Sequence, residues 1–130
     1  MTDLFKQQNA AHRVMGIISR AVPDPERVSV FLPDGWTPRD GPRILVQSDG
    51  TPTSSRGWTR ELVRVVVHTT DIYTARQLME RIDALLLTPG IHRLGCPISA
   101  ATGIIAIADS KVGGFVSSAT YNVALPRKVF

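Results

Sequence analysis

The sequence has little cysteine, few aromatic residues and no long apolar run, and each shortage excludes a class of protein. A single cysteine, Cys96, cannot form an internal disulfide, which excludes a disulfide-stapled secreted scaffold. No apolar run approaches the roughly 20 residues of a membrane-spanning helix. Residues 1–14 lack the cationic start and apolar block of a secretory signal. We therefore expect no membrane partner.

Positive charge is in excess but is not concentrated. Fifteen Lys and Arg residues against 11 acidic residues give a net charge of +4. Such a balance can favour an anionic partner, yet the basic residues form no run of the kind that marks a nucleic-acid-binding arm. A solvated basic surface is therefore favoured over a DNA-reading surface. With 130 residues, 43% apolar and 20% charged, we expect one domain over residues 1–130.

The N-terminal segment has the apolar spacing of an amphipathic helix. The pattern predicts a helix over residues 3–22, with Thr2 or Asp3 as its N-cap. Pro23 and Pro25 are expected to end it. The predicted apolar stripe consists of Leu4, Ala11, Met15, Ile18 and Val22.

Short strands and turns follow this helix. Alternating apolar residues predict a strand over residues 27–32, and the sequence PDGW at 33–36 predicts a turn. Residues 42–47 predict a second short strand. The polar, turn-rich segment 48–57 is interpreted as a mobile loop.

The segment TRELVRVVVH, residues 59–68, predicts a third strand with two different faces. Val63, Val65 and Val67 share a purely apolar face that we expect in the core. The other face is mixed, so we expect it to be only partly covered. A neighbouring subunit or ordinary solvent can explain that face. Its members are Arg60, Leu62, Arg64, Val66 and His68.

The cleanest helical pattern in the chain covers residues 72–87. Asp71 or Thr70 can supply the N-cap oxygen, and Pro89 and Gly90 are expected to stop the helix. The apolar stripe consists of Ala75, Leu78, Met79, Ile82, Leu85 and Leu86.

The C-terminal third predicts a β-hairpin. Residues 91–102 read as an irregular connection, and residues 103–126 as two strands joined by a glycine turn at 110–114. The tail, residues 126–130, is expected to be frayed or docked on a neighbour. The element order α-β-β-β-α-β-β predicts an α+β fold, with a mostly antiparallel sheet of about five strands and two amphipathic helices packed on it.

Two small constellations are candidates for chemistry, and neither is specific. His92 and Cys96 could form an activated thiolate–imidazole pair, but no third group orients them. Asp24 and Glu26 could divide acid and base work, but a proline-bounded turn explains them better. We therefore predict no enzyme, no catalytic residue, no metal site and no cofactor.

Both tryptophans follow a glycine in predicted loops. Trp36 and Trp58 could anchor a partner, because tryptophan is enriched among interface hot spots. Each could equally fold back over its own core. The sequence leaves both interpretations open.

The whole pattern resembles a known family. The strand RELVRVVVHTTD leads directly into the helix TARQLMERIDALLL, and a final hairpin ends in ATYNVALP. Together with the N-terminal helix and two short strands, this is similar to the tail terminator (tail completion) proteins of lambda-type long-tailed phages. The resemblance covers nearly the whole chain and rests on element order and pattern.

The resemblance implies a structural virion protein without catalysis. Such proteins form a hexameric ring on the head-proximal end of the tail tube, end tube polymerisation and present a docking surface to the head or neck. The implied partners are further copies of the chain, the tail tube protein and a neck or head–tail connector protein. DNA would pass through the lumen without sequence-specific binding. The expected location is the virion tail, after assembly in the host cytoplasm.

This family likeness suggests an interface hypothesis. Leu62, Arg64, Val66 and His68 would belong to a subunit–subunit or tube-facing surface. The loop around Arg56 and Trp58 would dock onto a neighbour or the tail tube, and Trp36 is a further candidate anchor.

Three other functions stay open. Another neck protein, for head completion or head–tail joining, could use a similar small α+β domain. A ferredoxin-like nucleic-acid-binding module is less favoured, because such modules usually need several aromatic residues on the sheet. A small enzyme is the third alternative, since side chains distant in sequence can meet in space.

Overall fold

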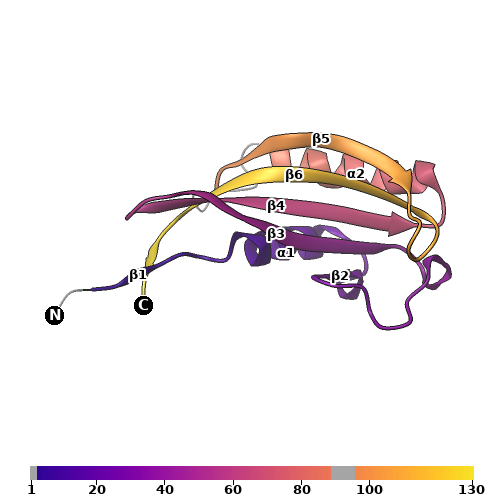
Figure 1. Ribbon diagram of the computed structural model, residues 1–130, viewed down its shortest axis with the longest axis horizontal. Helices are drawn as coiled ribbons and strands as arrows, with labels where there is room; N and C mark the ends of the chain where they lie inside the picture. Colours follow the sequence, from indigo (N-terminus) through magenta and orange to yellow (C-terminus); the bar gives the residue numbers. More distant parts are fainter. Residues whose placement is uncertain (1–2, 89–95) are drawn as a thin grey trace.

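Five strands form one sheet, and both α-helices lie on the same face of it (Figure 1). The computed structural model describes residues 3–88 and 96–130. The strand order is β2-β3-β4-β6-β5, and only the β2–β3 pair is parallel. The fold is therefore α+β with a mostly antiparallel sheet, as the sequence predicts. The strands are β2 (Val28–Ser29), β3 (Arg43–Ser54), β4 (Trp58–Thr69), β5 (Ile98–Ala108) and β6 (Phe115–Pro126), and the helices are α1 (Ala10–Ala21) and α2 (Ile72–Leu87).

Smaller elements extend this layer. A separate two-stranded sheet pairs β1 (Phe5–Lys6) with β7 (Lys128–Val129). Two short 3-10 helices lie on either side of β2 in the chain: η1 (Pro25–Arg27) precedes it and η2 (Pro38–Asp40) lies between β2 and β3.

The core lies between β4 and the two helices. Val63, Val65 and Val67 are fully buried and pack with side chains from both helices, which confirms their predicted face. Branched side chains suit a pleated strand, and removing them from water favours the packed layer. Ile18 of α1 and Met79 of α2 are fully buried in the same cluster.

Helix α2 begins and carries its apolar stripe where the sequence predicts. The Oδ1 atom of Asp71 accepts a hydrogen bond from the backbone N–H of Thr74 at 2.8 Å, which caps the helix. On its inner side, Asp83 accepts a 2.6 Å hydrogen bond from the hydroxyl of Tyr121 in β6. Burial, followed by the contact with Asp83, raises the pKa of this phenol strongly. The predicted stop at Pro89 and Gly90 lies outside the described residues.

The first helix starts later than predicted. Residues 3–8 are not helical, and Asn9 is the N-cap, with its side-chain oxygen accepting from the backbone N–H of His12 at 2.9 Å. Leu4 is 67% exposed and does not belong to the buried stripe. Strand pairing with the C-terminus competes with the weak helical pattern of this polar segment, and the prediction of a helix from residue 3 is wrong.

The predicted mobile loop at 48–57 is mostly strand. β3 continues to Ser54, and the register with β4 shifts on either side of Gly50, whose φ is +107°. These irregularities accommodate turn-type residues within a strand. Pro52 is tolerated because β2 pairs only with Ile44 and Leu45, which leaves this part of β3 at the sheet edge.

Three more boundaries differ from the sequence predictions. β2 stops at Ser29, whose hydroxyl donates to the carbonyl of Phe31 at 2.8 Å, so the predicted strand 27–32 is too long. β5 already begins at Ile98, so the prediction of an irregular connection over residues 91–102 is wrong from Ile98 onward. The tail is not frayed, because β7 pairs with β1 of the same chain, and its docking on a neighbour stays a prediction. Long-range backbone pairing decides the boundaries of β5 and the tail, whereas a local side-chain hydrogen bond accompanies the end of β2.

Candidate assembly surface

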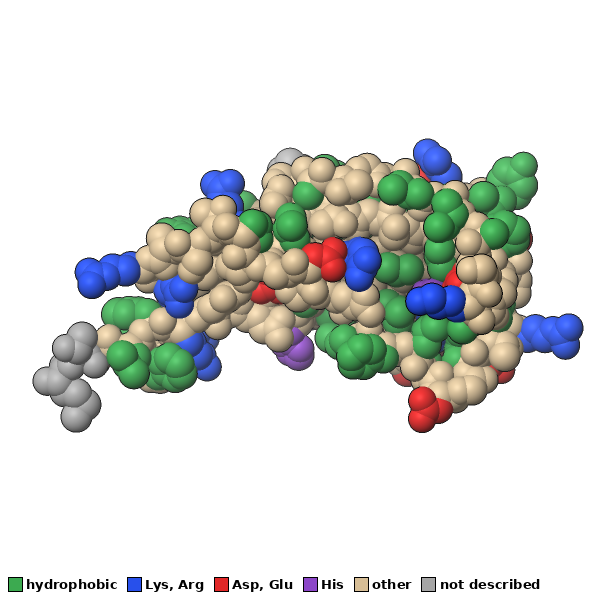
Figure 2. Space-filling view, in the orientation of Figure 1, with side chains coloured by type: hydrophobic (Ala, Val, Ile, Leu, Met, Phe, Trp, Pro, Cys, Tyr) green, Lys and Arg blue, Asp and Glu red, His purple; other side chains and the backbone are tan. Residues whose placement is uncertain are grey.

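The face of the sheet opposite the helices carries the mixed side chains of β4. Leu62 and Val66 are half-buried, and Arg64 is exposed between them. Their cross-strand neighbours on β6 are Asn122, Thr120 and Ser118. On the edge strand β5 the same face ends in Ile105 and Ile107, which are 51% and 56% exposed. Figure 2 shows this side with hydrophobic, cationic and acidic side chains intermixed.

Arg64 is held loosely on this open face. Its guanidinium donates to Oε1 of Gln47 at 3.2 Å and lies 3.4 Å from Oδ1 of Asp49. The side chain is 45% exposed. An exposed ion pair of this type contributes only about 0–1 kcal/mol. The guanidinium can therefore exchange Asp49 for a partner's acceptor at small cost.

His68 and Trp36 are buried within the chain and contact each other. Each is 9% exposed, and the two rings meet edge to face with centroids 5.7 Å apart. Nδ1 of His68 lies 3.4 Å from Oδ2 of Asp109, within ion-pair distance but without hydrogen-bond geometry. Burial lowers the pKa of His68 below 6.5, and the charge of Asp109 opposes that shift. Of the two interpretations of Trp36, the structure therefore supports the one in which it folds back.

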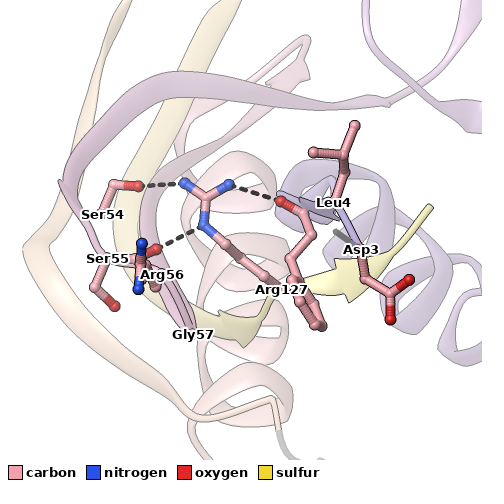
Figure 3. Close-up of a pocket in the computed structure, with 8 residues that line it drawn as sticks. Asp3, Leu4, Ser54, Ser55, Arg56, Gly57 and Arg127 are labelled. Atoms are coloured by element: carbon pink, nitrogen blue, oxygen red, sulfur yellow. Dashed lines mark hydrogen bonds between the residues drawn. The ribbon is translucent and has the colours of Figure 1, made fainter. Parts of the chain in front are cut away.

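The β3–β4 hairpin and both chain ends form a projecting arm at one end of the long axis (Figure 1). We define the arm as residues 3–8, 54–60 and 126–130. Arg127 ties its three segments together (Figure 3). Its guanidinium donates to the carbonyl of Ser55 and the hydroxyl of Ser54, both at 2.6 Å, and to the carbonyl of Phe5 at 3.3 Å. These bonds border a recess of about 750 Å³.

The arm exposes several large apolar side chains. Five large apolar side chains on it are between 50% and 79% exposed. They are Leu4, Phe5, Trp58, Val129 and Phe130. Five cations and one carboxylate accompany them, and Lys6 lies over the Phe130 ring at 5.7 Å. Several exposed large apolar side chains in one part of a chain, with charged neighbours, are typical of an interaction site.

The predicted loop residues both lie in the arm. Trp58 is 51% exposed, so here the structure supports the outward interpretation. Arg56 is exposed beside the recess. The structure thus separates the predicted interface residues into three places: Leu62, Arg64 and Val66 on the open face, Arg56 and Trp58 on the arm, and Trp36 and His68 in a buried pair.

Glu61 and Arg127 are structural residues that the sequence analysis missed. Glu61 is only 5% exposed, on the face of β4 that carries the core valines. Its carboxylate accepts from Nε2 of Gln7 at 3.2 Å and from the backbone N–H of Ala11, near the start of α1, at 3.3 Å. Glu61 lies two positions before Val63, so the alternation of the strand predicts that it shares the buried face. No such pattern predicts the role of Arg127.

Of the four candidates for chemistry, the structure describes Cys96, Asp24 and Glu26. His92 lies outside the described residues. Cys96 is buried, and burial raises the pKa of its thiol, although the charge of Arg13 opposes this. Asp24 is exposed and pairs with Arg27 at 3.6 Å.

The described part of the chain shows neither a metal-binding cluster nor a membrane-spanning helix. Within residues 3–88 and 96–130, no three His, Cys, Asp or Glu side chains gather closely enough to hold a metal ion. No helix in those residues has the length and apolar character required to cross a membrane.

Comparisons with known proteins assign no family. No protein-family model matches the chain, and no curated protein matches it significantly.

Proposed function

We propose that this chain is a structural protein of a phage virion that acts as a tail terminator. Six copies would form a ring on the head-proximal end of the tail tube, end its polymerisation and offer the opposite surface to the head or neck. The proposal starts from the resemblance in element order. The α+β fold is compatible with it.

One observation carries the proposal further than the resemblance. The chain has three separate areas with exposed apolar side chains: an open sheet face with Ile105 and Ile107, an arm with Trp58 and Phe130, and the segment after β2 with Phe31. A subunit of a ring that caps a tube needs at least two contacts with its neighbours and a third with the tube. Rigid strands with exposed apolar side chains are suited to repeated contacts of this kind.

The direct test uses tail tubes assembled from the cognate tube protein. Adding the purified chain during assembly should stop elongation and leave a ring at one end of each tube in electron micrographs. Tubes of unchanged length without terminal density would contradict the proposal. Binding to isolated heads or portals, without binding to tubes, would favour the other neck protein instead.

Arg64→Glu tests whether the open face takes part. The change should weaken assembly on tubes, because it removes a guanidinium from the surface and places a carboxylate beside the carboxylate of Asp49. Folding should be largely unaffected, because the position is exposed. Tube length and negative-stain images measure assembly, and thermal unfolding measures folding. Arg81→Glu, an exposed reversal on α2, is the matched control. Unchanged capping by Arg64→Glu would remove Arg64 from the interface.

A further inference from the structure

Two parts of this chain carry opposite net charge. The arm carries Lys6, Arg56, Arg60, Arg127 and Lys128 against Asp3 alone. Within the connection between α1 and β3, the segment of residues 24–40 carries four carboxylates and two cations, and Arg43 at the start of β3 donates to the carbonyl of Glu26 on its border. We name residues 24–40 the acidic lobe. In Figure 1 the arm lies at the left end of the long axis, and β2 with the loop that follows it lies to the right.

The acidic lobe also has exposed apolar side chains. Phe31 is 75% exposed and Val30 39%. Asp34 is exposed in the neighbouring turn, where Gly35 has a φ of +72°. Glu26 is exposed as well, and among the described residues neither of these carboxylates has an ion-pair partner. The lobe is thus complementary to the arm in charge, and both surfaces offer exposed aromatic rings.

We propose that the arm of one copy docks onto the acidic lobe of the next copy. The two surfaces lie on different parts of the chain, so the contact is heterologous, with one arm and one lobe left over at the ends of any open chain of copies. Such a contact closes into a ring when its rotation permits. The inference rests on the self-assembly in the proposed function and specifies which surfaces meet.

Complementary charges would orient the encounter, and aromatic side chains would hold it. Charged rims mainly speed and align association, whereas buried aromatic anchors contribute most of the affinity. Each surface therefore has a charged residue to orient the encounter and an aromatic residue to hold it. On the arm these are Arg56 and Trp58, and on the acidic lobe they are Asp34 and Phe31.

Two double variants each disable one surface. The arm variant carries Arg56→Glu and Trp58→Ser, and the lobe variant carries Phe31→Ser and Asp34→Lys. All four side chains are exposed, so the variants should fold, which circular dichroism can verify. Arg81→Glu is again the charge-reversal control.

Sedimentation velocity should be measured from about 1 μM to about 1 mM, the range in which weak complexes populate. The wild type and Arg81→Glu should self-associate, and each double variant should associate about 30-fold more weakly or worse. A mixture of the two variants should form a one-to-one dimer, because the intact lobe of the arm variant can still accept the intact arm of the lobe variant. A chain with Arg56→Glu and Asp34→Lys together should associate better than either single reversal.

Three outcomes would overturn the inference. They are a wild type that stays monomeric over the whole range, double variants that associate like the wild type, and a mixture that forms no dimer. The tube assay separates this result from the proposed function. If the chain caps tubes although the arm and lobe do not meet, only the head-to-tail contact is wrong. If copies join through arm and lobe but tubes elongate unchanged, the terminator role is wrong and the contact stands.

Discussion

The packed layer around β4 and the projecting arm are held together by different forces. In the layer, Val65 and Met79 are fully buried, and their removal from water stabilises the fold. In the arm, extended segments are joined by short strand pairing and by the hydrogen bonds of Arg127. Damage to the layer should therefore unfold the chain, whereas damage to the arm should act locally. Surface function can thus be altered in the arm without loss of the fold.

The largest expected effect on stability comes from a cavity in the layer. Met79→Ala should lower the free energy of unfolding by about 2–5 kcal/mol, because the surrounding core collapses only partly into the space. Chemical denaturation measures the change. Tyr73→Ala on the same helix, at a position 79% exposed, should change it by less than about 0.5 kcal/mol. Similar losses for both variants would contradict the distinction between layer and surface.

A smaller effect should follow from Tyr121→Phe. The change removes the 2.6 Å hydrogen bond to Asp83 but keeps the ring. Hydrogen bonds to charged groups contribute about 1.5–3 kcal/mol, so the loss should lie in that range and should also appear in chemical denaturation. Asp83→Asn retains an acceptor and is expected to lose less. A larger loss for Asp83→Asn would mean that Asp83 acts through another contact.

The arm offers the opposite case. Arg127→Ala should lower global stability by only about 1 kcal/mol, but it should speed backbone hydrogen exchange around residues 55–57 and residue 5, where its contacts lie. Mass spectrometry of exchanged peptides can measure this. Arg127→Lys keeps the charge but not the fork of donors, so it should open the arm nearly as much. Exchange that rises equally in β4 would show that the arm is not an independent unit.

The smallest expected effect is a pH dependence from His68. Its pKa is lowered in the folded state mainly by burial, so between that pKa and 6.5 the native chain binds fewer protons than the unfolded chain. The stabilising contribution is complete above pH 6.5 and is lost as pH falls through the lower native pKa. Asp109 opposes the shift, which keeps the effect small. Unfolding titrations of the wild type and His68→Gln should differ in slope just below pH 6.5, with the steeper slope in the wild type.

The best sequence predictions concerned segments whose signals are local. The alternating valines of β4 and the spacing from Asp71 through Leu86 required no information from elsewhere in the chain, and the structure agrees with both. The glycine turn before β6 is of the same kind, since Gly113 and Gly114 both have positive φ. Periodicity and capping are properties of adjacent residues, so they can be recognised without a fold.

The errors fall where pairing between strands overrides the local signal. Asp49, Gly50 and Pro52 indicated a loop, but pairing with β4 and bulges around Gly50 retain them in a strand. The helix predicted from residue 3 gives way to pairing between Phe5 and Val129. For the candidate site, the exposed Trp58 and the buried Trp36 had the same local signal and different outcomes.

By itself, the sequence determined the β4–α2 unit, the final hairpin and the α+β class, because period-two and helical patterns, caps and turn glycines act within a few residues. Only the tertiary structure decided the arm, the Trp36–His68 contact and the opposite net charge of the arm and the acidic lobe. The bond from Arg127 to Phe5 spans 122 positions. Contacts at that separation depend on the entire path of the chain, so no local sequence pattern predicts them.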